Sequence, residues 1–208
     1  MSTEIVAAPQ PCEGGWRAQF AHPCGKLGWL VGHLMAFKNR ERSEWVLSRL
    51  NLDEEDRALE IGFGPGMDIK RASARAGYVD GVDPSDVMLQ LARRRNAGAV
   101  AAGRVNLRAG AMPRLPFDGA TFDKAFSINS YQFWPDPSTS AAELRRVMKP
   151  DGRVAIAVQP RNTGATESTV REVGRDIAGR LESAGFSDVQ ISYKKMKPVS
   201  TVCVMAKA

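Results

Sequence analysis

The spacing of hydrophobic residues changes at about residue 57. Before this point, residues 26–50 carry apolar side chains at roughly helical spacing, which predicts one or two amphipathic helices. After it, short apolar runs alternate with longer segments of helical spacing. The short runs predict strands over 57–61, 78–83, 104–110, 122–128 and 152–158, and the longer segments predict helices over 67–76, 85–97 and 138–148. This alternation predicts a parallel sheet with helices on both faces.

The end of the sequence breaks the alternation. A predicted helix over 167–184 is followed by two β-rich runs, 187–198 and 199–208, with no room for a helix between them. Such a pair forms a hairpin, so at least one strand runs antiparallel to the others. The predicted fold is therefore α/β, with a doubly wound, mainly parallel, seven-stranded sheet that ends in an antiparallel hairpin.

A length of 208 residues fits one domain with its own core. We predict a flexible N-terminus over 1–15 and a single domain over 16–208, in which residues 16–50 form N-terminal helices that act as a lid and residues 55–208 form the α/β core. The first residues lack a secretory signal pattern, and the longest apolar run, 28–37, is about half a membrane span. A cytoplasmic location is expected.

Charge and cysteine usage exclude several classes of function. The net charge is +6, but the basic residues are scattered along predicted helices without interleaved aromatic residues, which is atypical of a nucleic-acid surface. Cys12, Cys24 and Cys203 are too far apart for a disulfide framework or a zinc site. We therefore expect neither a nucleic-acid partner nor a metal.

The segment LEIGFGPGMD, residues 59–68, carries three glycines at alternate positions directly after the first predicted strand. Ligands of open parallel sheets bind beyond the carboxyl ends of the strands, and glycine lets a ligand approach the backbone closely. The spacing G-x-G-x-G differs from the G-x-G-x-x-G of dinucleotide sites, and Asp68 at the helix start would repel a pyrophosphate. A cationic ligand group fits this turn better.

Asp83 ends the second predicted strand. A carboxylate there can accept two hydrogen bonds from a ribose diol, each worth about 1.5–3 kcal/mol. Together with Glu60 and Asp68 at the glycine turn, it predicts a site for an adenosine-like ribose joined to a positively charged group.

Four sequence blocks in order over 57–158 resemble the small bacterial S-adenosylmethionine-dependent methyltransferases of the seven-strand family (class I, methyltransferase type 11). The blocks are LEIGFGPG, GVDPSDVMLQLA, LPFDGATFDKAFSINSYQFWPDP and ELRRVMKPDGRVAI. The resemblance implies S-adenosyl-L-methionine as cofactor and S-adenosyl-L-homocysteine as product. It also implies cofactor contacts by Glu60, Gly62, Phe63, Gly64, Gly66, Asp83, Pro84, Met88, Gly110, Ala111, Met112 and Ser127.

One position departs from the family. The family often has an acid after the third strand that hydrogen-bonds the adenine amino group, and this chain has Ala111 there. Adenine must then rely on the backbone near Ala111 and Met112 and on apolar packing.

Methyl transfer needs mainly the alignment of a nucleophile with the sulfonium methyl, so a general base is optional. The candidate catalytic residues are Asn129 and Tyr131 after the fourth strand, which would orient an acceptor, and His33 in the N-terminal segment. We predict transfer to a small-molecule acceptor by a monomer or a homodimer. The apolar face of 16–50 could instead rest on a membrane surface, which leaves a lipid or quinone acceptor as an alternative.

Two other classes of protein share parts of this pattern. A nicotinamide-dependent dehydrogenase would have the G-x-G-x-x-G turn and often a helical Tyr-x-x-x-Lys, whereas Tyr193 and Lys197 lie in a predicted strand region. A cofactor-binding module without turnover would show the same motifs, and only an assay of transfer separates it from an enzyme.

Overall fold

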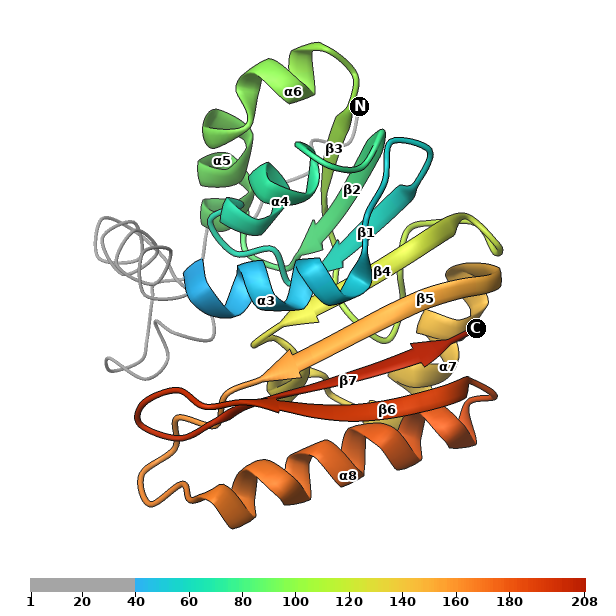
Figure 1. Cartoon of the computed structure of the whole chain (residues 1–208). Helices are drawn as coiled ribbons and strands as arrows, with labels where there is room; N and C mark the ends of the chain where they lie inside the picture. Colours follow the sequence, from blue (N-terminus) through green and yellow to red (C-terminus); the bar gives the residue numbers. More distant parts are fainter. Residues whose placement is uncertain (1–39) are drawn as a thin grey trace, which may run out of the picture.

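The computed structural model describes residues 40–208, and its elements alternate as the sequence predicts (Figure 1). The strands are β1 (Arg57–Ile61), β2 (Tyr78–Asp83), β3 (Val105–Ala109), β4 (Phe122–Ile128), β5 (Met148–Val158), β6 (Ser187–Lys194) and β7 (Thr201–Lys207). The α-helices are α3 (Arg40–Leu50), α4 (Met67–Ala72), α5 (Asp86–Arg95), α6 (Ala97–Ala101), α7 (Pro137–Val147) and α8 (Glu167–Ser183), and η1 (Tyr131–Phe133) is a short 3₁₀ turn.

The strands form a seven-stranded sheet in the order β3-β2-β1-β4-β5-β7-β6. Strands β1 to β5 pair in parallel, and β7 pairs antiparallel with both β5 and β6. This confirms the predicted fold, including the antiparallel C-terminal hairpin. The strand order reverses between β1 and β4, so the crevice beyond their carboxyl ends is the place where a ligand is expected.

Several element boundaries differ from the sequence prediction: the helix predicted over 67–76 ends at Ala72, and the strand predicted over 187–198 ends at Lys194. Strand β5 begins at Met148 and not at 152, because the pairing with β4 shifts register between Phe122 and Lys124, and Asp151 adopts a left-handed φ of 65° near this irregularity. The predicted helix over 85–97 ends at Arg95 and a separate short helix follows, because the Asn96 side chain donates hydrogen bonds to the carbonyls of Gly66 and Ala92.

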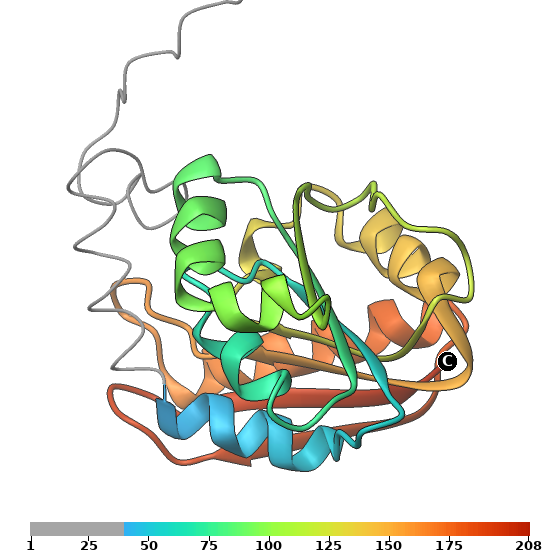
Figure 2. The same ribbon diagram turned by 90° about the horizontal axis from the view of Figure 1, so that it is seen from above.

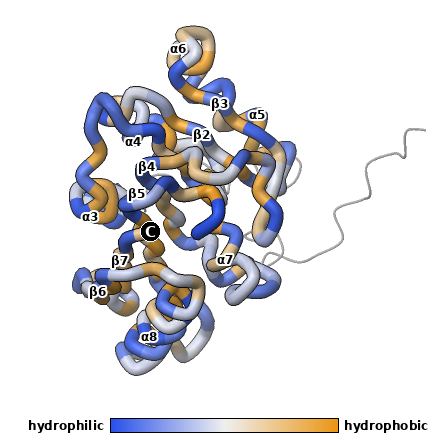
Figure 3. The backbone as a smooth tube through the Cα atoms, turned by 90° about the vertical axis from the view of Figure 1, so that its right-hand side faces the viewer, coloured by the Kyte–Doolittle hydropathy of each residue, from blue (hydrophilic) through white to orange (hydrophobic). Residues whose placement is uncertain are grey.

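The sheet separates two hydrophobic cores. Helices α3, α4 and α5 contribute to one core, and α7 and α8 contribute to the other. Figure 2 shows α3 on one side of the strands and α7 on the opposite side. Helix α8 buries one side against the sheet. Hydrophobic and hydrophilic positions accordingly alternate along this helix in Figure 3.

Residues 40–50 form helix α3, which packs against one face of the sheet. Val46, Leu47 and Leu50 of α3 are at most 1% exposed and join the core on their face of the sheet. This part of the predicted lid therefore packs on the sheet. The rest of it, 16–39, and the N-terminus predicted to be flexible lie outside the described residues. Within 40–208, no helix is long and apolar enough to cross a membrane.

Candidate active site

The glycine turn adopts the backbone that its sequence predicts. Gly62, Gly64 and Gly66 have φ values of 76°, 50° and 74°, a region that residues with a Cβ rarely adopt. The Gly62 amide donates a hydrogen bond of 2.8 Å to the Val82 carbonyl, which fixes the turn to the end of β2. A Cβ on Gly64 would meet nothing within 4 Å, so this glycine borders open space.

Asp83 at the end of β2 lies beside this turn. Its two carboxylate oxygens accept hydrogen bonds from the backbone amides of Gly64, at 2.8 Å, and Ser85, at 2.9 Å. The carboxylate therefore joins the glycine turn to the start of α5. An ionised carboxylate offers about four lone-pair sites, which suits it to accept several hydrogen bonds at once.

A large cavity opens at the carboxyl ends of β1 to β5. Its volume is about 1650 Å³. The predicted cofactor residues that line it are Glu60, Gly62, Phe63, Gly64, Asp83, Pro84, Met88, Gly110, Ala111 and Met112. The fold thus brings together residues from the ends of three strands that are separated along the sequence.

Two residues predicted to contact a cofactor lie outside the cavity lining. Gly66 is buried, and an added Cβ there would come within 2.6 Å of the Ala92 Cβ, so this glycine permits α4 and α5 to pack closely. Ser127 is 1% exposed, and its hydroxyl lies 2.7 Å from that of Ser130. Its side chain takes part in a contact between polypeptide segments. The predicted residue His33 lies outside the described part of the chain.

Glu60 is a buried carboxyl in the cavity lining. It is only 2% exposed, and its Oε2 atom has no hydrogen-bond partner among the described residues. Burial raises the pKa of Glu60 well above its ordinary value, and the neighbouring carboxylates of Asp68 and Asp83 raise it further. A ligand cation beside this carboxyl would stabilise its ionised form.

Asp68, the acid that the sequence places at the start of α4, already has protein partners. Ser43 donates a hydrogen bond of 2.9 Å to Oδ2, and Arg71 approaches Oδ1 at 2.7 Å. Burial raises the pKa of Asp68, whereas Ser43 and Arg71 lower it. Asp68 lines the cavity, but Ser43 and Arg71 already contact its carboxylate. A ligand cation would therefore stabilise the carboxylate of Glu60 more than that of Asp68.

The segment after β4 forms the next part of the cavity wall. Asn129 has a left-handed φ of 56°, and its Oδ1 accepts a hydrogen bond of 2.8 Å from the Gln159 amide. The Ser130 hydroxyl donates to the Ile61 carbonyl at 2.7 Å, so this segment is tied to the glycine turn. Both Asn129 and Tyr131, predicted to orient an acceptor, line the cavity.

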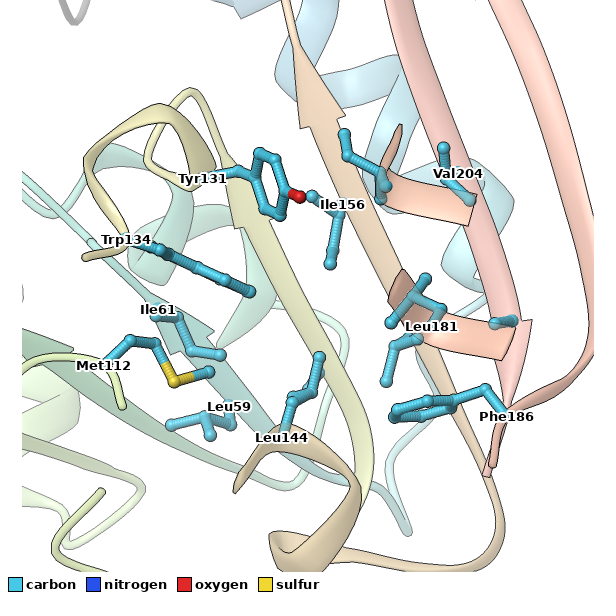
Figure 4. Close-up of a cluster of buried hydrophobic side chains, with 14 of the residues drawn as sticks. Leu59, Ile61, Met112, Tyr131, Trp134, Leu144, Ile156, Leu181, Phe186 and Val204 are labelled. Atoms are coloured by element: carbon cyan, nitrogen blue, oxygen red, sulfur yellow. The ribbon is translucent and has the colours of Figure 1, made fainter. Parts of the chain in front are cut away.

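Tyr131 is 7% exposed, and its ring packs against Trp134 with centroids 5.1 Å apart. Figure 4 shows both rings at the edge of the core, with the Tyr131 hydroxyl pointing toward Ile156. That hydroxyl donates a hydrogen bond of 2.6 Å to Oδ2 of Asp176 on α8. Burial and the neighbouring carboxylate raise the pKa of Tyr131, so the phenol remains protonated and acts as a donor.

Sequence reasoning missed the contribution of α8 and of the loop after β5. The cavity wall there consists of residues 158–163 together with Thr169, Glu172, Val173 and Asp176. The spacing of apolar residues over 167–184 predicts a helix. It does not indicate that one face of the first half of this helix lies toward the ends of β4 and β5.

Comparison with known proteins agrees with this geometry. Residues 59–156 match the family described as "Methyltransferase domain". The uncharacterized methyltransferase YdaC of Bacillus subtilis is 33% identical over 180 residues, which cover 86% of this chain and 97% of that protein. The ubiquinone/menaquinone biosynthesis C-methyltransferase UbiE of Geobacter sulfurreducens is 34% identical over 109 residues, which cover 50% of this chain and 41% of that protein.

Solved structures show the same fold. The crystal structure of a SAM dependent methyltransferase from Aquifex aeolicus superposes with a TM-score of 0.62 at 23% identity, covering 79% of this chain and 88% of that one. The sequence relatives are methyltransferases, and the solved structure shares the fold of this chain. The chain belongs to the class I S-adenosylmethionine-dependent methyltransferases.

Proposed function

We propose that this protein binds S-adenosyl-L-methionine in the cavity and transfers its methyl group to a small-molecule acceptor, releasing S-adenosyl-L-homocysteine. The observation that carries this proposal is the buried carboxyl of Glu60, whose Oε2 has no hydrogen-bond partner among the described residues, beside a glycine turn that borders open space. A buried carboxyl oxygen without a partner is costly, and a ligand ammonium would satisfy it.

The cofactor would lie across the ends of β1, β2 and β3. Its amino-acid end would meet Glu60 and the backbone of Gly62 and Gly64, and its ribose hydroxyls would donate to Asp83. Adenine would pack between Met88 and the segment 110–112. Since Ala111 offers no carboxylate, backbone groups of this segment supply the polar contacts to the base.

The bound cofactor supplies a methyl group that is already activated by a sulfonium leaving group. The acceptor's lone pair forms the new bond to the methyl carbon, and the electrons of the broken carbon–sulfur bond stay on sulfur as a neutral thioether. An O–H or N–H acceptor gives its proton to water. The protein's own contribution is alignment, and Asn129 and Tyr131 are placed in the cavity wall for it.

A small-molecule acceptor is supported by the size of the cavity and by the Geobacter relative, a ubiquinone/menaquinone biosynthesis C-methyltransferase. The test is titration of the full-length chain with S-adenosyl-L-homocysteine, with NAD⁺ as the control ligand, followed by incubation with methyl-labelled cofactor and a metabolite and lipid extract. We expect S-adenosyl-L-homocysteine to bind at micromolar concentration, NAD⁺ not to bind, and labelled products to form. Absence of that binding would refute the proposal, and binding without any transfer would identify a non-catalytic module.

A further inference from the structure

The cavity is larger than one cofactor needs. Small-molecule pockets measure about 300–1000 Å³, and this cavity measures about 1650 Å³. The part lined by residues 131–135, residues 158–163 and the inner face of α8 contains none of the residues predicted to contact the adenosine group. We call this part the outer chamber. It has room for a second molecule beside the cofactor.

One face of α8 provides the polar groups of the outer chamber. Thr169, Glu172, Val173 and Asp176 follow each other at the three- and four-residue spacing that places side chains on one side of a helix. Two of the four are carboxylates one turn apart. Among the described residues that line the cavity, Arg161 is the only basic one, so carboxylates outnumber cations on this wall.

Asp176 differs from Glu172 in how it is held. Tyr131, in the 3₁₀ turn after β4, donates to Oδ2 at 2.6 Å, and Arg180 approaches Oδ1 at 3.2 Å. The Asp176 side chain nevertheless remains 44% exposed at the cavity wall. Each carboxylate oxygen has a second lone pair, so this oriented carboxylate can accept a further hydrogen bond from a molecule in the chamber.

The chamber also offers an aromatic surface. Phe133 is 51% exposed although it lines the cavity, and Tyr131 and Trp134 of the same segment also line it. Exposed phenylalanine is unfavourable in water, and a ring of a bound molecule would pack well against it. The site therefore combines an apolar, aromatic wall with one oriented hydrogen-bond acceptor.

We propose that the methyl acceptor is a flat, largely apolar ring that carries an O–H or N–H group, and that Asp176 accepts the hydrogen bond of that group. Tyr131 orients the Asp176 carboxylate, and Phe133 packs against the ring. Carboxylate or phosphate groups on the acceptor are disfavoured, because Glu172 and Asp176 would repel them. This inference rests on the proposed methyltransferase function and specifies its acceptor.

The test uses matched ligand pairs in which methyl groups replace the hydrogens of the O–H or N–H groups. The full-length chain, saturated with S-adenosyl-L-homocysteine, is titrated calorimetrically with catechol and 1,2-dimethoxybenzene, and with 4-methylaniline and N,N-dimethyl-4-methylaniline. Phenyl phosphate is the anionic probe. A hydrogen bond to a carboxylate predicts that at least one O–H or N–H compound binds about 10- to 100-fold more tightly than its methylated partner. Which pair shows the difference separates a hydroxyl from an amine acceptor.

Variants assign the preference to Asp176. Asp176→Ala should abolish the preference for the O–H or N–H compound over its methylated partner, and Tyr131→Phe should reduce this preference in part. Both variants should bind S-adenosyl-L-homocysteine with the affinity of the wild type. Glu182→Ala removes an exposed acid of the same helix outside the cavity and should keep the full preference. Melting temperatures verify that each variant is folded.

The inference fails if the methylated partners bind as tightly, if phenyl phosphate binds most tightly, or if no O–H or N–H compound binds at millimolar concentration. It also fails if Asp176→Ala retains the preference. Loss of S-adenosyl-L-homocysteine binding by the wild-type chain would instead refute the proposed function, so the two failures are distinguishable.

Discussion

Adding a single methyl group to Gly62 should mainly lower stability, whereas adding one to Gly64 should mainly weaken ligand binding, although only Phe63 separates the two glycines. An ideal Cβ on Gly62 would lie 2.3 Å from the Ser130 Cβ and 2.5 Å from its Oγ, distances that real side chains do not tolerate. A Cβ on Gly64 would meet no protein atom within 4 Å and would point into the space where we place the cofactor.

The two costs can be estimated separately. A left-handed backbone costs an alanine about 1–2 kcal/mol, and overpacking adds about 1–3 kcal/mol. Gly62→Ala has both terms, about 2–5 kcal/mol, whereas Gly64→Ala has only the first. At about 2–4 °C per kcal/mol for a chain of this size, the melting temperature should fall by about 4–20 °C for Gly62→Ala and by about 2–8 °C for Gly64→Ala.

The assay combines thermal unfolding with calorimetric titration of S-adenosyl-L-homocysteine. Gly64→Ala should weaken binding at least about tenfold, because the added methyl holds the ligand away from the backbone. Gly98→Ala is the control, since its Cβ also meets nothing within 4 Å but lies in α6, where alanine is favourable by about 0.5–1 kcal/mol. Equal destabilisation by Gly62→Ala and Gly64→Ala, or wild-type affinity in Gly64→Ala, would refute this reasoning.

Three other substitutions test the site and the scaffold. The pKa of Glu60 in the folded protein lies well above its ordinary value of 4.5. Above about pH 4.5 the unfolded chain therefore releases a proton that the ligand-free folded protein still binds. The free energy of unfolding should fall as the pH rises through this range. Glu60→Gln should flatten this fall in pH-dependent urea unfolding and weaken S-adenosyl-L-homocysteine binding; an unchanged pH profile would contradict it. Asp83→Ala should weaken that binding by about 2 kcal/mol, or roughly 30-fold, in the same titration, and near-wild-type affinity would show that the ribose lies elsewhere. Thr166→Ala removes the side chain that caps α8 and should lower the free energy of unfolding by about 1 kcal/mol without a change in ligand affinity; a change of the ligand affinity instead would mean that the cap shapes the cavity.

The sequence by itself determined the fold and the position of the glycine turn and Asp83 at one edge of the sheet. Alternating strand and helix patterns fix parallel pairing, and parallel strands place all their carboxyl ends at one edge of the sheet. Gly62, Gly64 and Asp83 could therefore be brought together without coordinates, because each directly follows or ends a strand. The structure confirms this placement.

The tertiary structure alone decided which part of α8 lines the cavity and which contacts individual side chains make. Tyr131 and Asp176 are 45 residues apart, and their hydrogen bond depends on how α8 is rotated against the sheet, which no local pattern encodes. Gly66 looked like its two neighbours in the turn, yet its role is to let α4 pack against α5. Local spacing determines which residues reach the edge of the sheet, whereas packing between distant elements determines which of them face the cavity.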